Sequence, residues 1–472
     1  MIGWSKNLAQ DFNLSDPFSY SKSKNEIEKI VSGNALFPSM KPFASRYGGH
    51  QFGHWAGQLG DGRAITLCEI KSNTTKYEFQ LKGSGKTPYS RQGDGRAVLR
   101  SSLREFICSE FMDALGVPTT RSLSLVLTGD QVMRDLLYDG NPKLEPGAIA
   151  SRLSPSFIRF GNFEILAAQN EINNLKILTD YVIENFYPEC FSSNEKQKYI
   201  LFLESVVRKT AYLIAKWMSF GFVHGVMNTD NMSILGLTID YGPYGWLEEF
   251  DSNFTPNTTD YGQRRYSYNN QPEIGLWNLN ALAQALYPLI QDKDLIISTL
   301  EVYQGEFQKE FKSNFEKKLG IDFNLNLVNR LFELMNQSKI DFTRFFRKIC
   351  YPQKINTTQE IYEFLSDLSY LKEIPQNHLD QWLEWWLEYN KLLKIEKINE
   401  MKKTNPSIIF RNYMAFEMTD RIQKSTMLNI QDELQELLQP FKERDLKTDS
   451  LTFIRPDWAM NKPGCSFLSC SS

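Results

Sequence analysis

Cysteine and histidine are scarce in this chain of 472 residues, which contains six cysteines and four histidines. Six cysteines are too few for a disulfide scaffold and are typical of a protein from a reducing compartment. Four scattered histidines offer no cluster for a metal that imidazole would bind. These two absences exclude a disulfide-rich secreted domain and a histidine-based metal centre.

Long apolar runs and an excess of one charge are also missing. No apolar run approaches the ~20 residues that a membrane-spanning helix needs. The net charge is only −3, whereas dedicated nucleic-acid-binding proteins usually carry a strong basic excess. The first residues, Met1 to Asn7, lack the layout of a signal or transit peptide. We therefore expect a cytoplasmic protein that binds neither nucleic acid nor membranes.

Glycine is concentrated in one part of the chain. It recurs in dense groups between Gly48 and Gly161 and almost disappears beyond residue 280. The first half therefore favours strands and tight turns, and the second half favours helices. Alternating runs at 64–70 and 77–82, separated by polar residues, predict a β-hairpin. A strand is predicted at 122–127, with a turn at 128–130.

Helices are predicted at 97–115 and at 196–220, where Gly221 ends the second one. Helical patterns continue beyond residue 280. Among them, the tryptophan-rich segment 381–389 has the spacing of a packed helix face rather than a partner-binding face. A strand-rich part followed by a helical part places the chain in the α+β class.

The segment Gly83–Thr87 resembles the end of a P-loop but is not one. A P-loop needs a glycine at position 80, and Gln80 stands there. Pro88 also disfavours helical geometry at Thr87, where the helix of a P-loop should already have begun.

A different nucleotide-binding pattern fits better. A glycine-rich turn at 57–63 leads into a strand, the next strand ends at Lys82, and the following helix carries Glu105 on a partly inward face. A glycine-rich turn, a strand lysine and a helix glutamate form the nucleotide-positioning half of a kinase-type lobe. A purely structural Lys82–Glu105 pair is the alternative.

The second half of the pattern follows the helix that ends at residue 220. Asp230 and Asn231 lie on one loop, and the triplet Asp240-Tyr241-Gly242 follows a short apolar run. In kinases, an Asp on such a loop lies near the attacking hydroxyl, and an Asn and the triplet Asp hold Mg²⁺ through oxygen atoms. Here Asp230 and Asn231 are adjacent rather than spaced apart. That departure keeps open a nucleotide-binding scaffold without catalysis.

Arginines and one histidine complete the set. Arg152 and Arg159 flank one short segment, and guanidinium groups suit the oxygens of a triphosphate. His224 either orients the active site or braces the loop, and the sequence leaves both roles open.

Several strings are similar to the selenoprotein O family: residues 46–53, 87–91, 156–161 and 224–240, and the Cys-Ser-Ser ending. The resemblance extends from about residue 40 to the C-terminus. It implies a two-lobed, protein-kinase-like pseudokinase fold with a strand-rich lobe at 1–130, a helical lobe at 131–320 and a helical C-terminal region at 321–472. It also implies transfer of AMP from ATP to Ser, Thr or Tyr hydroxyls of proteins, with the chain itself as one candidate acceptor.

The same resemblance implies roles for individual residues. Asp230 is the expected proton acceptor, Asn231 and Asp240 are the expected ligands of Mg²⁺ or Mn²⁺, and Glu105 is the ion-pair partner of Lys82. The expected nucleotide-binding residues are Gly60, Gly62, Arg63, Lys82, Asp94, Gly95, Arg152, Arg159 and Asp240.

Two features depart from the family pattern. Cys470 stands where some members carry selenocysteine, and a thiol is the slower nucleophile. The stretch at 254–257, where bacterial relatives have a cysteine that pairs with this end, contains none, so Cys465 is the nearest redox partner for Cys470. A conventional kinase that transfers the γ-phosphoryl group is the enzymatic alternative to AMP transfer.

Overall fold

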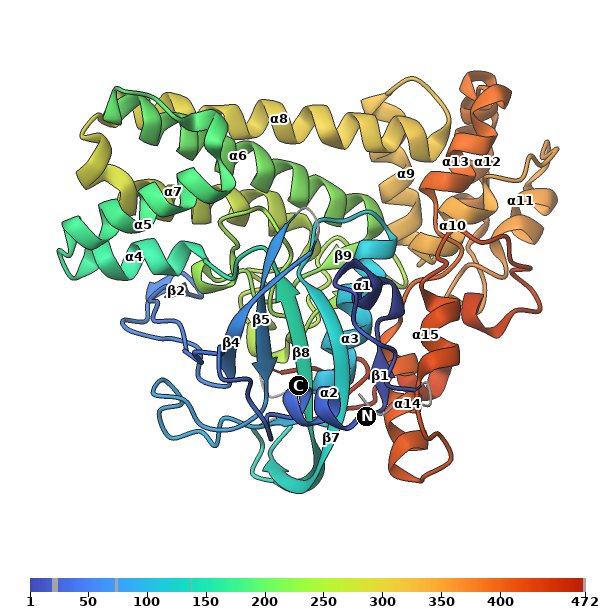
Figure 1. Cartoon of the computed structure of the whole chain (residues 1–472). Coiled ribbons are helices and arrows are strands. Elements are labelled where there is room, and N and C mark those ends of the chain that lie inside the picture. The colour runs from blue at the N-terminus through green and yellow to red at the C-terminus, as the bar shows by residue number, and fades with distance from the viewer. Residues whose placement is uncertain (19–23, 73–74, 137, 470–472) are drawn as a thin grey trace.

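A six-stranded antiparallel sheet forms the first part of the protein (Figure 1). The computed structural model describes residues 1–18, 24–72, 75–136 and 138–469. The strand order is β1-β7-β8-β5-β4, and the short β6 also pairs with β8. The strands are β1 (Gly3–Trp4), β4 (Ala64–Lys71), β5 (Lys76–Lys82), β6 (Ala97–Val98), β7 (Arg121–Arg134) and β8 (Lys143–Ser154).

The predicted hairpin is confirmed as β4 and β5, with Ala64 opposite Lys82. Strand β5 also pairs with β8, and Gln80 lies opposite Arg152. Because successive side chains alternate between the faces of a strand, Gln80 and Lys82 lie on the same face as Arg152. The sheet register therefore brings the predicted lysine and one predicted arginine together.

Strand β7 differs from its prediction. The turn expected at 128–130 is absent, and the strand continues to Arg134 with a change of register between Leu127 and Gln131. Gly129 has φ +85°, so this glycine allows a bulge without ending the pairing. The predicted lobe boundary at 130 falls inside β7, and the sheet extends to Ser154.

Helix α3 (Leu99–Ala114) covers one face of this sheet. It begins two residues later than predicted, because Ala97 and Val98 pair with Ala148 and Gly147 as strand β6. Helices α1 (Lys6–Asp11) and α2 (Lys24–Val31) lie on the opposite face, where Trp4, Leu8 and Ile30 join a separate apolar cluster with Phe79 and Leu153.

A second layer of helices lies over one end of the sheet (Figure 1). The predicted helix at 196–220 is confirmed as α6, and Gly221, with φ +70°, caps it. The helices of this layer are α4 (Phe160–Ala168), α5 (Ile172–Phe186), α6 (Glu195–Phe220), α7 (Gln271–Ile290) and α8 (Lys293–Leu319). Two two-stranded antiparallel sheets accompany them: β2 (His50–Gln51) with β3 (His54–Trp55), and β9 (Phe222–Val223) with β10 (Gly245–Trp246).

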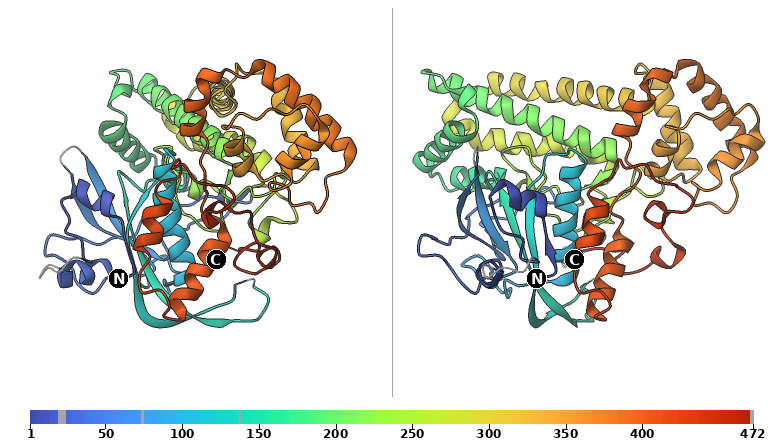
Figure 2. Two further views of the ribbon diagram at one scale, coloured as in Figure 1. Left: turned by 90° about the vertical axis from the view of Figure 1, so that its right-hand side faces the viewer. Right: turned by 45° about the vertical axis from the view of Figure 1, so that its right-hand side comes forward.

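The C-terminal region is helical, as predicted. It wraps back onto the first part, since α14 packs on α3 and Ile430 N–H donates to the carbonyl oxygen of Ile2 at 2.9 Å (Figure 2). None of the helices in the described ranges is long and apolar enough to span a membrane. The helices are α9 (Leu325–Gln337), α10 (Phe342–Lys348), α11 (Thr358–Leu365), α12 (Gln376–Leu392), α13 (Ile398–Thr404), α14 (Asn412–Gln423) and α15 (Gln431–Leu437).

The tryptophans of α12 are packed, as predicted. Trp382, Trp385 and Trp386 are buried, and the indole N–H of Trp385 donates to the carbonyl oxygen of Leu327 at 3.0 Å.

We expect Trp385→Ala to lower the free energy of unfolding by about 3–5 kcal/mol, because it leaves a large cavity. Leu387→Ala on the exposed side of α12 should change it by less than about 0.5 kcal/mol. Urea unfolding of both variants tests this, and equal losses would contradict the packing role.

Candidate active site

A cavity of about 490 Å³ lies between the sheet and the loop that follows α6. Nine of the predicted site residues line it: Gly60, Gly62, Arg63, Lys82, Asp94, Gly95, Arg152, Asn231 and Asp240. Glu105, Asp230 and Arg159 are not among its lining residues; they lie behind or beside it. The fold thus gathers side chains from the glycine-rich turn, β5, β8 and the loop at 224–243 around one space.

The carboxylate of Asp240 is held by three cations. Lys82 Nζ and Arg152 Nη1 donate to its Oδ1 at 3.0 and 2.7 Å, and Arg159 Nη1 donates to its Oδ2 at 2.5 Å. These cations hold the pKa of Asp240 well below its usual range despite burial. Asp240 has φ +56°, a left-handed conformation that is strained for a non-glycine residue. We infer that the three ion pairs hold it in this conformation.

Glu105 is the second anion of this cluster. Its Oε1 accepts from Lys82 Nζ at 2.9 Å and from Arg152 Nη1 at 2.8 Å. The side chain of Gln80 accepts from Arg152 Nε at 3.1 Å, so the guanidinium is surrounded by acceptors. A buried cation needs such partners because desolvation is costly. The lysine–glutamate ion pair expected from the sequence is thus one edge of a larger network.

Helix α4 and His224 position the remaining parts of the cluster. Arg159 is the N-cap residue of α4, and its Nη1 also donates to the backbone carbonyl oxygen of Asp230 at 2.9 Å. His224 is buried, and its Nε2 lies 2.9 Å from the carbonyl oxygen of Ile239, next to Asp240. Burial lowers the pKa of His224. The contact with Ile239 fixes the backbone just before Asp240, which fits the bracing role predicted as one of two for His224.

Asp230 is nine-tenths buried, and its two carboxylate oxygens differ. Gln51 Nε2 donates to Oδ2 at 3.3 Å, whereas Oδ1 is buried with no hydrogen-bond partner among the described residues. Burial raises the pKa of Asp230 to about 6, although Arg159 opposes the shift. An aspartate with a raised pKa and one free oxygen suits a proton acceptor.

Asn231 lines the cavity together with Asp240. Its Nδ2 donates to the carbonyl oxygen of Val226 at 2.9 Å, which leaves Oδ1 as an acceptor beside Asp240 in the same cavity. Amide and carboxylate oxygens are ligands that Mg²⁺ prefers. No group of three or more His, Cys, Asp and Glu residues suited to a metal occurs within the described ranges. A Mg²⁺ shared with phosphates needs only two protein ligands, so Asn231 and Asp240 fit that ion.

Asp94 and Gly95 form the far wall of the cavity. Arg134 binds the Asp94 carboxylate with both Nη atoms, at 2.7 and 2.8 Å, and this pairing lowers the pKa of Asp94 to about 2. Gly95 has φ +69°, and a methyl group there would lie 2.0 Å from the carbonyl oxygen of Gly85. Only glycine fits this position.

Comparison with known proteins gives the family. The model of the family described as "Protein adenylyltransferase SelO" matches residues 2–441. The chain belongs to this SelO family. Curated relatives named "Protein nucleotidyltransferase YdiU" include the proteins of Flavobacterium johnsoniae (46% identical; 95% of this chain and 89% of the relative), Nitrosospira multiformis (46%; 100% and 89%) and Xanthomonas euvesicatoria (47%; 100% and 92%).

The SelO-type site contains residues that sequence reasoning did not single out. Arg134 lines the cavity from β7, and Gln51 caps Asp230 from the hairpin of β2 and β3. The strings at 46–53 and 121–134 have no local pattern that points to either contact. Gln51 lies within residues 46–53, one of the segments that resemble the family, and this resemblance was the sequence signal that could have identified it.

The C-terminal tail of this SelO-family chain packs against the body up to Ser469. Leu468 accepts from Thr258 N–H at 2.7 Å, and Cys465 is buried. Burial raises the pKa of the Cys465 thiol to about 12, which disfavours the reactive thiolate. The five cysteines within the described ranges are all free. Cys465, predicted as the nearest redox partner for Cys470, is thus buried in the reduced form, and Cys470 lies outside the described residues.

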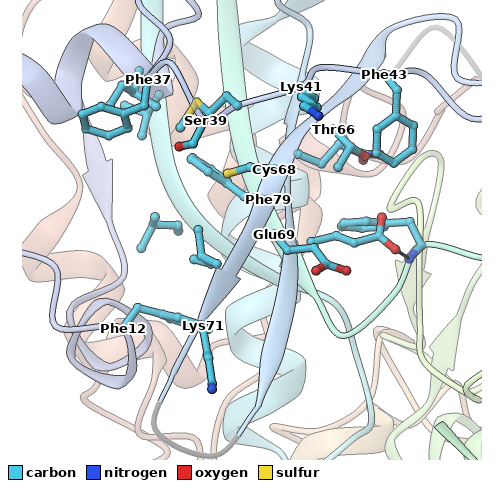
Figure 3. Close-up of a pocket in the computed structure, with 18 of the residues that line it drawn as sticks. Phe12, Phe37, Ser39, Lys41, Phe43, Thr66, Cys68, Glu69, Lys71 and Phe79 are labelled. Atoms are coloured by element: carbon cyan, nitrogen blue, oxygen red, sulfur yellow. Dashed lines mark hydrogen bonds between the residues drawn. The ribbon is translucent and has the colours of Figure 1, made fainter. Parts of the chain in front are cut away.

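A larger cavity of about 1000 Å³ lies on the opposite face of the sheet (Figure 3). Its walls are mostly apolar and include Phe12, Phe37, Phe43 and Phe79, which come from the N-terminal segment and β5. None of the predicted site residues lines it. The predicted site residues that line a cavity therefore line the smaller one.

A substitution of Arg152 tests whether the buried charge cluster stabilises the fold. We expect Arg152→Ala to lower the free energy of unfolding by about 3–5 kcal/mol, because Glu105 and Asp240 lose a buried partner. Arg208→Ala on α6, whose side chain is 48% exposed, should cost less than about 1 kcal/mol. Chemical denaturation of both variants measures the difference. A loss for Arg152→Ala no larger than that for Arg208→Ala would contradict the structural role of the cluster.

Proposed function

We propose that this protein transfers AMP from ATP to Ser, Thr or Tyr hydroxyl groups of proteins and releases pyrophosphate. The main observation is the pairing of a cation-lined cavity with a buried aspartate beside it. The cavity carries Lys82, Arg152 and two oxygen donors, and the aspartate is Asp230. The family to which the chain belongs is described as a protein adenylyltransferase, which agrees with this chemistry.

The cavity suits a triphosphate because its cations are fixed before the nucleotide arrives. Lys82, Arg152 and Arg63 line it, and Arg159 lies directly behind Asp240. Groups held in place in this way stabilise developing charge without reorganising during the reaction. The glycines at 60, 62 and 95 let the backbone approach the nucleotide closely.

Asn231 and Asp240 would hold Mg²⁺ or Mn²⁺. When bound, the ion would neutralise phosphate charge and polarise the bond to the leaving group. In the transfer itself, the acceptor oxygen forms a bond to the α-phosphorus while the bond from that phosphorus to pyrophosphate breaks. The hydroxyl proton passes to the free Oδ1 of Asp230, which has no other partner among the described residues.

We also propose a two-lobed, kinase-like body. The sheet with α3 forms the first lobe, α4 to α8 form the second, and the cavity lies between them. The strand pairing supports a lobe boundary near residue 154 rather than 130, and α8 ends at Leu319, next to the boundary expected at 320. Six cysteines and the absence of a basic excess support a cytoplasmic protein with protein rather than nucleic-acid substrates.

Labelled ATP tests the reaction. The protein is incubated with Mg²⁺, a mixture of proteins and ATP labelled in either the α- or the γ-phosphate. We expect protein-bound label from the α position only, with a mass gain of one AMP by intact-mass spectrometry. Label from the γ position would indicate a conventional kinase instead. Thermal stabilisation by ATP with no label in any protein would indicate a scaffold.

Substitution of the aspartates assigns their roles. Asp230→Asn should lower the transfer rate by about 10²- to 10⁴-fold, because the proton acceptor is lost, while thermal stabilisation by ATP persists. Asp240→Ala should abolish metal-dependent transfer. Asp322→Asn, at a side chain that is 86% exposed, is the control and should transfer AMP like the parent. Full activity of Asp240→Ala would rule out the proposed metal site.

A further inference from the structure

Arg104 of α3 is a buried cation that the proposed transfer does not use. It precedes Glu105 and is only 1% exposed. Among the described residues, no carboxylate forms an ion pair with Arg104, in contrast to the cations that surround Asp240. The neighbouring Arg100 already pairs with Glu145 at 2.9 Å, so that glutamate does not neutralise Arg104. A buried guanidinium in this setting needs neutral acceptors, because desolvation is costly.

The first acceptors of Arg104 are backbone carbonyl groups that follow Asp240. Arg104 Nη2 donates to the carbonyl oxygen of Tyr244 at 2.9 Å and to that of Gly242 at 3.3 Å. The guanidinium carbon lies 4.2 Å from the centre of the Tyr244 ring, and the Tyr244 hydroxyl donates to the carbonyl oxygen of Arg104 at 3.1 Å. Gly242 N–H in turn donates to the carbonyl oxygen of Asp240 at 2.8 Å. Arg104 therefore fixes the backbone that follows Asp240 to α3.

A further acceptor of Arg104 comes from the C-terminal region. Its Nη1 donates to the side-chain oxygen of Asn412, the first residue of α14, which packs on α3 (Figure 2). The start of α14 is itself held, because Arg411 pairs with the buried Asp341 at 2.8 Å. Asp341 is the N-cap residue of α10. One guanidinium thus joins α3, the segment after Asp240 and the C-terminal region.

We infer that Arg104 and Asn412 are positioning residues through which the C-terminal region holds Asp240 in place for metal binding. This inference rests on the metal site of the proposed function. Three cations hold the Asp240 side chain, and its strained backbone, with φ +56°, gains support from the residues that follow. Groups that lie behind a metal ligand commonly set its orientation.

Loss of the Asn412 oxygen would act on Asp240 through Arg104. It would leave Arg104 with an unpaired buried N–H group, which is costly. A shift of the guanidinium toward another acceptor would weaken its contact with Gly242, the longer of its two bonds to carbonyl oxygens. The backbone that follows Asp240 would then be held less firmly.

Metal binding tests the inference directly. Free Mn²⁺ is followed by electron paramagnetic resonance while the ion is added to the protein together with a non-hydrolysable ATP analogue. We expect Asn412→Ala to raise the apparent Kd for Mn²⁺ by about tenfold or more, since residues that orient a metal ligand typically have effects of this size. In transfer assays with α-labelled ATP, the Mg²⁺ concentration that gives half the maximal rate should rise in parallel, while the KM for the acceptor protein stays unchanged.

Matched variants separate positioning from a general loss of structure. Asn412→Asp keeps a side-chain oxygen for Arg104 and should bind Mn²⁺ like the parent. Arg104→Lys keeps the charge but not the fork of N–H groups, so it should raise the Kd as Asn412→Ala does. Gln423→Ala, at an exposed position at the end of α14, should leave the Kd unchanged. The melting temperature of each variant is measured alongside.

The outcomes separate this inference from the proposed function. A merely structural role would lower the melting temperature of Asn412→Ala without changing the Mn²⁺ affinity of the folded protein, and that result would overturn the inference. Equal increases in Kd for Asn412→Asp and Asn412→Ala would also overturn it, because the oxygen would then be irrelevant. Failure of the parent to bind Mn²⁺ would overturn the proposed metal site and this inference together. A parent that binds Mn²⁺ but transfers no α-label to any protein would contradict AMP transfer alone.

Discussion

The contact between Asp240 and three buried cations holds the site together. Lys82 comes from β5, Arg152 from β8 and Arg159 from the start of α4, while Asp240 follows the catalytic loop. Glu105 adds α3 to the same network. A buried guanidinium without acceptors would be too costly to keep, so each element must reach the cluster in the folded state. The position of the sheet relative to the helix layer depends on this charge balance.

The same network explains why the candidate site is preorganised. Asp240 is held in a left-handed conformation that costs on the order of 1–3 kcal/mol, and its three partners offset that cost. His224 braces the residue before it through the carbonyl oxygen of Ile239. The loop that carries Asp230 and Asn231 contacts both the cavity and the hairpin of β2 and β3. Asn231 and Asp240 line the cavity, and the carboxylate of Asp230 accepts from Gln51 of the hairpin.

Much of the candidate site could be predicted from the sequence, because the patterns that indicate it span only a few residues. The hairpin of β4 and β5, the helix that carries Glu105, and the triplet at Asp240 each follow from alternation, helical spacing or a local motif. Those patterns also placed Lys82 at the end of a strand and Gly221 at the end of α6. Such features depend on residues close in sequence, so a sequence can specify them before any tertiary contact forms.

Other features depended on pairing between distant segments. The sequence indicated a turn at 128–130, but the pairing of β7 with β8 resumes at Gln131 after a bulge and continues to Arg134. Cys465 was predicted as a redox partner for Cys470, and nothing in the sequence near it indicated its burial, which accompanies contacts such as that of Thr258 with Leu468. Gln51 had no local sign of its contact with Asp230, more than a hundred residues away. The sequence by itself determined which chemical groups the protein carries and the local elements that bear them. Only the tertiary structure decided which of those groups are buried and which are paired, because burial and ion pairing depend on where distant segments meet.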